Sequence, residues 1–333
     1  MRSRSTNLPV FEDGVFTNTV KDFIYFKRAC GLKYEDSAEY VLRQISHQLN
    51  QYPVDQPVLT QEMVFKIIEK RPHESYATQA RRITYIRELS KYMDDKGYVA
   101  YIYPEQSIHK EEKTFIPYIF TNEEIKNIFL IVDSLPKNRR YPYYHVVYPV
   151  LVRILYSCGM RVSEALLLKI KHYNVSDGTV LIEKSKNRSR IVPLSRSMSV
   201  VLLRYLENRF GSNPDPERYI FEAHDGNNYS RHTVLCAVRS IYKKAGIPVD
   251  ISIHHPNVHS FRHNHAVTAM EKMQTDGMDL YCMLPVLSSF LGHKGVRETE
   301  RYLCLPQFRL AEIAEAGHHL INHVIPEVPC VEE

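Results

Sequence analysis

Helical periodicity stops between Tyr98 and Phe120, and this break most limits how the chain can fold. Before it, apolar residues recur at helical spacing in four segments, 17–29, 36–49, 60–70 and 75–95. Within it, Pro104 and Pro117 flank a charged run, a composition typical of a linker. We therefore predict two domains. The predicted boundaries are 1–105 for a helical bundle, 106–118 for a linker, 119–325 for a second domain and 326–333 for a tail.

The second domain is predicted to be mainly helical, with one pair of strands. Thr121 and Glu124 fit a capping box ahead of an apolar helix. Two short β-branched segments, 179–183 and 189–193, are separated by polar residues and predict a hairpin. Further helices are predicted at 149–158, 163–170, 200–208, 231–245, 259–273 and 306–323. The predicted fold class is therefore mainly α with a small β-sheet, an α+β protein.

Composition excludes several classes of protein. Hydrophobic residues make up 44% of the 333 positions, which is enough to form buried cores and too apolar for a disordered tail. The best candidate for a membrane span, Tyr144 to Cys158, is too short and carries Arg153. Six scattered cysteines include no C-x-x-C pair, so we expect reduced thiols. Because the N-terminus has no apolar signal core, we expect a cytoplasmic protein with no membrane partner.

The predicted hairpin is strongly cationic. Lys184, Lys186, Arg188 and Arg190 place four positive charges within seven residues, and only Glu183 opposes them. Such a hairpin can enter a nucleic-acid groove or hold a phosphate, while the alternative interpretation is a solvated turn. The net charge of +5 permits a polyanionic partner but does not require one.

Two short motifs place an arginine close to a helix start. His259 and Arg262 are spaced so that they share one helix face, where a guanidinium can bind two phosphate oxygens and an imidazole can move a proton. Arg161 precedes another helix start, and Glu164 lies three residues later, where it can hold that guanidinium. The alternative for each is an ordinary surface residue or ion pair of small value.

A third motif ends in a tyrosine. The segment Leu291-Gly292-His293 is followed nine residues later by Tyr302. A tyrosine hydroxyl is a poor nucleophile at its ordinary pKa of about 10. It becomes useful when cations surround its target and another group removes its proton.

Taken together, these residues form an ordered set that resembles the catalytic signature of the tyrosine recombinases, the phage integrase family. The set is Arg161, Lys186, His259, Arg262, His293 and Tyr302. Four segments carry the resemblance, namely LYSCGMRVSEALLLK, SKNRSRIVPLS, HSFRHNHAVTAM and LSSFLGHKGVRETERYL. The match covers residues 115–320, and the N-terminal bundle resembles the family's core DNA-binding domain by position and helix content.

The resemblance implies a site-specific DNA recombinase of the integrase or transposase type. By this resemblance, Tyr302 attacks a scissile phosphate and forms a 3′-phosphotyrosyl bond, which releases a 5′-hydroxyl. Arg161 and Arg262 would stabilise charge on the non-bridging oxygens. Members of the family need neither a metal ion nor a nucleotide cofactor, so we expect no cofactor here.

The remaining site residues receive roles from the same resemblance. Lys186 would be the general acid that protonates the leaving oxygen, although the short hairpin leaves the choice between Lys184 and Lys186 open. His259 would assist proton transfer or act as general base, and His293 would hydrogen-bond the phosphate. Glu164 would orient Arg161. The other hairpin cations, Lys184, Arg188 and Arg190, are candidates for DNA contacts.

The resemblance also implies partners. Both domains would clamp double-stranded DNA at a specific site, and the protein would be associated with the bacterial nucleoid when bound. Family members work as tetramers, and the amphipathic segment 306–323 would pack into a neighbouring protomer or, alternatively, onto its own domain. The target sequence, an accessory or partner recombinase, and a phage, transposon or chromosomal role stay open, although the long stretch 275–289 resembles transposon-encoded members.

The sequence also allows three other interpretations. His255, His259 and His263 lie four residues apart, with His265 and His293 as possible additions, and could form a zinc site. No H-E-x-x-H motif and no acidic residue accompanies these histidines, which disfavours metal binding. A type IB topoisomerase shares the phosphotyrosine chemistry. A DNA-binding accessory protein without activity is disfavoured because every signature position is filled.

Overall fold

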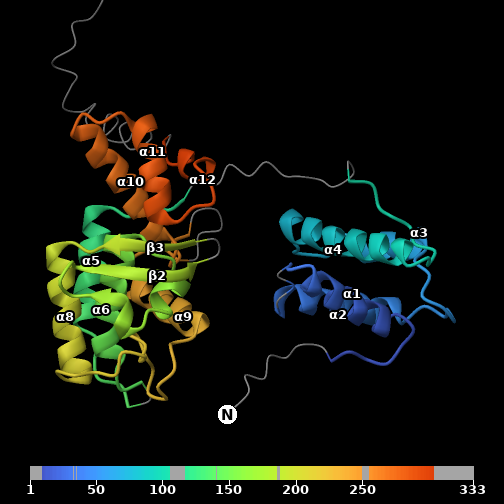
Figure 1. The fold of residues 1–333 in the computed structure, drawn as a ribbon, viewed down its shortest axis with the longest axis horizontal. Coiled ribbons are helices and arrows are strands. Elements are labelled where there is room, and N and C mark those ends of the chain that lie inside the picture. The colour runs from blue at the N-terminus through green and yellow to red at the C-terminus, as the bar shows by residue number, and fades with distance from the viewer. Residues whose placement is uncertain are drawn as a thin grey trace, which may run out of the picture. The chain divides into compact units, whose positions relative to one another are not determined.

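The computed structural model describes residues 10–303 apart from 33, 35, 106–116, 140, 186–187 and 250–254, and without the side chains of residues 184, 185 and 188. The chain forms two compact units, Met1–Thr114 and Phe115–Glu333 (Figure 1). Most of the predicted linker lies outside the described residues.

The first unit is a bundle of helices whose bounds are α1 (Thr17–Ala29), α2 (Asp36–Leu49), α3 (Gln61–Ile68) and α4 (Tyr76–Asp95). Polar side chains set two of the helix starts, because Thr60 accepts the N–H of Met63 and Ser75 accepts that of Thr78. Apolar faces from all the helices meet in one core, with Phe23 fully buried within it. The segments predicted from helical periodicity are confirmed to within two residues at each end.

The second unit begins with the predicted capping box. The Thr121 hydroxyl accepts the Glu124 N–H at 3.1 Å, and the Glu124 carboxylate accepts the Thr121 N–H at 2.8 Å. This box starts α5 (Asn122–Asp133). The helices that follow in this unit are α6 (Tyr144–Cys158), α7 (Val162–Leu166), α8 (Arg196–Phe210), α9 (Arg231–Lys244), α10 (Ser260–Thr275), α11 (Leu280–Leu291) and α12 (Arg297–Glu300).

Helix α6 is the central helix of this unit. It packs against α5, α8 and α10, so neighbouring elements cover it on several sides (Figure 1). A helix covered in this way is apolar around most of its circumference, and Val147, Leu151 and Leu155 are fully buried. This burial explains the apolar stretch noted in the sequence. None of the helices in the described ranges has the length and apolarity needed to cross a bilayer.

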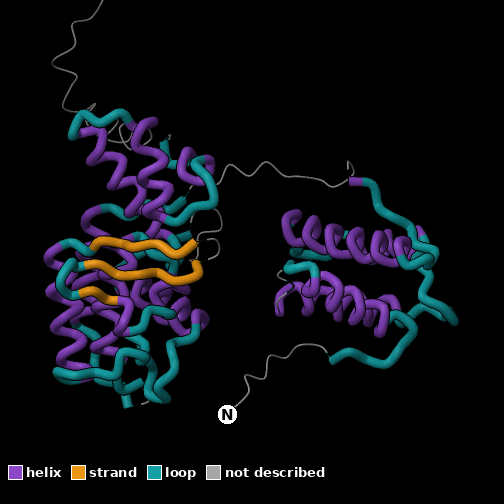
Figure 2. The backbone as a smooth tube through the Cα atoms, viewed as in Figure 1, coloured by secondary structure: helices purple, strands orange, loops and turns teal. Residues whose placement is uncertain are grey.

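The small sheet is antiparallel and contains β1 (Tyr173–Asn174), β2 (Thr179–Ser185) and β3 (Arg188–Pro193) in that order (Figure 2). Val180 pairs with Val192, and both point into the core, while the next pair, Leu181 and Ile191, is exposed. The predicted hairpin is confirmed. Its strands extend further than predicted, because pairing continues past an irregularity to Ser185 and Arg188.

Helix α11 is not among the helices predicted from the sequence. Pro285 lacks an N–H and weakens a helix prediction at this place. The structure forms the helix because Asp279 caps it by accepting the N–H groups of Tyr281 and Cys282. Apolar side chains then pack it onto α10, with Leu291 fully buried. The helix predicted at 306–323 lies outside the described residues.

Candidate active site

Several elements that are distant in sequence meet at one place in the second unit. They are the C-terminal ends of α6 and α11, the starts of α7 and α10, and strand β3. Gly159 ends α6 in the left-handed conformation, with φ 57° and ψ 22°. This reversal places Arg161 directly before α7, so that its guanidinium faces the end of α11.

Gly159 also allows a close approach of α10. A Cβ at this position would lie 2.8 Å from Cδ2 of His265, whose ring stacks on Phe290. We expect Gly159→Ala to lower the free energy of unfolding by about 2–4 kcal/mol, from the left-handed backbone and the overpacking together. Gly246→Ala is the matched control, because Gly246 has φ 77° and nothing within 4 Å of the added carbon. Urea denaturation measures both, and equal losses would contradict the packing argument.

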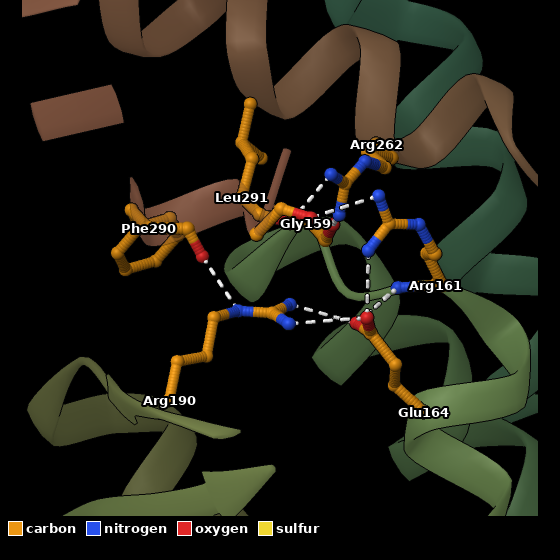
Figure 3. A network of polar contacts seen from close by, with 8 residues as sticks. Gly159, Arg161, Glu164, Arg190, Arg262, Phe290 and Leu291 are labelled. Atoms are coloured by element: carbon orange, nitrogen blue, oxygen red, sulfur yellow. Dashed lines mark hydrogen bonds and ion pairs between the residues drawn. The ribbon is translucent and has the colours of Figure 1, made fainter. Parts of the chain in front are cut away.

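A buried carboxylate holds two guanidinium groups at the centre of the site. Glu164 accepts Nη1 of Arg161 at 2.8 Å and binds Arg190 through both terminal nitrogens, at 2.7 and 3.1 Å. Figure 3 shows these guanidinium groups pointing at the carboxylate from two sides. The Glu164 side chain is only 4% exposed, so the ion pairs are poorly screened by water. The predicted pairing of Glu164 with Arg161 is therefore present in the structure.

The two signature arginines are anchored on backbone carbonyls. Arg262 is 1% exposed and donates to the carbonyls of Gly159 and Leu291, while Arg161 donates to that of Gly292 at 3.0 Å (Figure 3). Carbonyls at helix C-terminal ends lack intrahelical partners and carry partial negative charge, which suits guanidinium groups. Burial and the neighbouring Arg161 lower the pKa of Arg262 to about 10, so it stays cationic at neutral pH.

Three histidines and the predicted tyrosine form a cluster of rings beside these arginines. His259 contacts His263 edge to face, with ring centroids 4.7 Å apart. His263 Nδ1 lies 2.7 Å from the Tyr302 hydroxyl. The His293 ring is nearly parallel to that of Tyr302, with centroids 6.4 Å apart, and its Nδ1 lies 2.7 Å from Thr299 Oγ1. The three signature residues of the ring cluster, His259, His293 and Tyr302, are thus brought together.

The electrostatics of the cluster favour neutral rings. Desolvation by the surrounding protein, followed by the charges of Arg262 and Arg161, lowers the pKa of His259 to about 4, although its side chain retains exposed surface. The same causes lower the pKa of His293 to about 3. Burial raises the pKa of Tyr302, and the nearby guanidinium groups oppose this without reversing it. The phenol is therefore protonated at neutral pH and must lose its proton before it can act as a nucleophile.

Of the four predicted hairpin cations, Arg190 is the one whose side chain the structure describes. Lys186 lies outside the described residues, and so do the side chains of Lys184 and Arg188. Arg190 was predicted to contact DNA. Its guanidinium is 10% exposed, and it donates Nε to the Phe290 carbonyl at 2.8 Å in addition to binding Glu164. This placement favours a role in holding the site together.

The sequence did not predict a place in the catalytic site for two groups, the His263 side chain and the backbone carbonyls that bind the arginines. His263 follows His259 by one helical turn, a spacing that could have indicated a shared face. The carbonyls that bind the arginines give no sequence signal, because every residue has one. Among the residues that the structure describes, no group of three or more His, Cys, Asp or Glu side chains is arranged to hold a metal ion.

Comparisons with known proteins place the chain in a family. The sequence profile of the phage integrase family matches residues 119–306. Tyrosine recombinase XerA of Pyrococcus horikoshii is 23% identical over 288 residues, which cover 85% of this chain and 90% of that protein. Two solved structures share the fold. One is the XerH site-specific recombinase bound to difH substrate in a pre-cleavage complex, with TM-score 0.62, 18% identity and coverage of 92% of this chain and 98% of that one.

The other solved structure is a lambda integrase dimer bound to a COC′ core site. It has TM-score 0.63 and 14% identity, and it covers 86% of this chain and 94% of the other. The family match spans more than half of this chain and includes every element that forms the site. The chain belongs to the phage integrase family and is a tyrosine-type site-specific recombinase.

Proposed function

We propose that this recombinase cleaves and rejoins double-stranded DNA through a 3′-phosphotyrosyl bond to Tyr302. The observation that carries the proposal is the convergence of two anchored guanidinium groups with a ring cluster that contains Tyr302. Cations at fixed positions stabilise the negative charge that develops on a phosphate during substitution. Arg161 and Arg262 are held by buried backbone and carboxylate partners, so little reorganisation is needed when the phosphate arrives.

In the proposed cleavage step, the nucleophile loses one proton and the leaving oxygen gains one. The Tyr302 phenol loses its proton to a base, the phenolate oxygen bonds to phosphorus, and the bond from phosphorus to the 5′-oxygen breaks. Lys186 gives the leaving oxygen its proton, and His293 donates a hydrogen bond to the phosphate. The phosphotyrosyl link keeps the energy of the phosphodiester, so a second strand's 5′-hydroxyl reseals the DNA without ATP. The arginines supply the charge that a metal ion would otherwise provide.

The proposed DNA partner is supported by the solved relatives, two of which are bound to recombination or core sites. We propose that the helical unit, Met1–Thr114, contributes to DNA binding as a core-binding domain and that Phe115–Glu333 carries the catalytic site. Four strands are exchanged in a complete recombination, so the working assembly is a tetramer on two duplexes. The segment 306–323 is the proposed link between protomers.

The test is the capture of the covalent intermediate. A binding site is first selected from a random duplex library with the full chain, and a nick is then placed so that a short fragment with the 5′-hydroxyl is lost after cleavage. The full chain, incubated with this substrate in EDTA and without nucleotide, is expected to form an adduct with the 5′-labelled strand. Peptide mapping should place the DNA on Tyr302.

Other outcomes have distinct meanings. Relaxation of a supercoiled plasmid that lacks the selected site would favour a type IB topoisomerase. Site-specific binding without any adduct would favour an accessory DNA-binding protein. An adduct on a different tyrosine would contradict the proposed nucleophile while leaving the reaction class intact.

A further inference from the structure

His263 lies within hydrogen-bonding distance of the hydroxyl group of Tyr302. Its Nδ1 lies 2.7 Å from that oxygen, within the range of a strong hydrogen bond. Both residues are nearly inaccessible, with His263 4% and Tyr302 2% exposed. A buried hydroxyl that lost this partner would be left unsatisfied, so the contact fixes where the oxygen lies.

The contact is built from two rigid elements. His263 lies in the first turn of α10, directly after Arg262, and is therefore held at a fixed offset from that anchored guanidinium. Tyr302 follows α12 and packs in a core formed mainly by α10 and α11, which includes Val267 and Leu291. A hydrogen bond between these elements sets the phenol oxygen relative to Arg262.

The pKa shifts make both partners of this hydrogen bond neutral at pH 7. Burial, followed by the charges of His259 and Arg262, lowers the pKa of His263 to about 3, so its ring is neutral at pH 7. Burial raises the pKa of Tyr302, so the phenol keeps its proton. Two neutral partners allow either direction: the phenol donates to Nδ1, or a proton on Nδ1 is donated to the phenol oxygen.

We propose that His263 is a positioning residue for the nucleophile: the hydrogen bond between its Nδ1 and the Tyr302 hydroxyl holds the phenol oxygen in place for attack on the phosphate. This inference rests on the proposed function of Tyr302. It assigns positioning rather than proton removal to His263, because burial and the nearby Arg262 charge make its ring a weak base. A misplacement of reacting atoms by about 1 Å can slow a reaction by about 10²-fold.

The test compares two substitutions at this position on the nicked suicide substrate. The Asn amide can present its oxygen or its NH2 group where the imidazole has Nδ1, so His263→Asn keeps a hydrogen-bond partner for the phenol but has no basic nitrogen. His263→Ala removes the partner. With the full chain, we expect His263→Ala to bind the selected DNA normally and to cleave it about 10²-fold more slowly in a single turnover. His263→Asn should recover most of the wild-type rate.

The controls separate the proposed role of His263 from a loss of folding and from a failure of the proposed function. His145→Ala removes a partly buried histidine near the opposite end of α6 and should cleave at the wild-type rate. Thermal melts show whether each variant is folded at the assay temperature. If His263→Asn is as slow as His263→Ala, positioning by a hydrogen bond is wrong. If His263→Ala cleaves as fast as the wild type or faster, the contact does not support attack. If the wild type forms no adduct, the proposed function itself fails.

Discussion

Tyr302→Phe is expected to bind the selected DNA as tightly as the wild type and to form no covalent adduct. The substitution removes only the hydroxyl, which lies inside the protein against His263 and is separated from solvent. Without that oxygen the phosphate has no protein nucleophile, so cleavage should fall below detection rather than by a measured factor. The substitution also removes the hydrogen bond to His263, and we expect a loss of about 1 kcal/mol in unfolding free energy.

Tyr281→Phe is the matched control for this experiment. Tyr281 lies on α11 in the same unit and is 75% exposed, so its hydroxyl faces solvent instead of the site. It should bind and cleave like the wild type. Gel shift measures binding, and denaturing gels measure the adduct. Adduct formation by Tyr302→Phe at any rate comparable to the wild type would show that another residue is the nucleophile.

Glu164→Gln is expected to produce the largest loss of stability among single substitutions at the site. The carboxylate binds Arg161 and Arg190, and the ion pairs are almost fully buried. Removing one partner of a buried ion pair typically costs about 3–5 kcal/mol, because the remaining charge is left without compensation. Here two guanidinium groups lose that compensation, so we expect a loss in this range in urea denaturation. Cleavage should also slow by about 10-fold or more, since Arg161 loses its orientation.

Glu217→Gln provides a control with similar partners in a different environment. Glu217 also binds two cations, Lys169 and Lys171, at 2.8 and 2.7 Å. Its carboxylate is exposed, so water and salt replace the lost contacts and the unfolding free energy should hardly change. If both variants lose the same stability, burial is not what makes Glu164 important. If neither loses stability, the network in Figure 3 does not hold the fold together.

Much of the fold could be predicted from local pattern. The helices of the first unit follow apolar periodicity, and the start of α5 follows from the capping box at Thr121 and Glu124. The strands of the hairpin follow from alternating β-branched residues. Helix α11 could not be predicted in this way, because Pro285 opposes a helix locally and packing onto α10 stabilises it.

The sequence by itself supplied the candidate chemistry, because its arginine before a helix, its histidine and arginine on one face, and its tyrosine nine residues after His293 form an ordered set that resembles the tyrosine recombinase signature. Apart from the Arg161–Glu164 pair, which the spacing already indicated, only the tertiary structure decided which groups these residues contact. In the folded chain, Arg190 binds Glu164, and His263 contacts the Tyr302 hydroxyl. The two signature arginines bind the backbone carbonyls of Gly159, Leu291 and Gly292. The physical reason is that side-chain identity fixes what a group can donate or accept, whereas its partner depends on helix ends that meet only when the chain is folded.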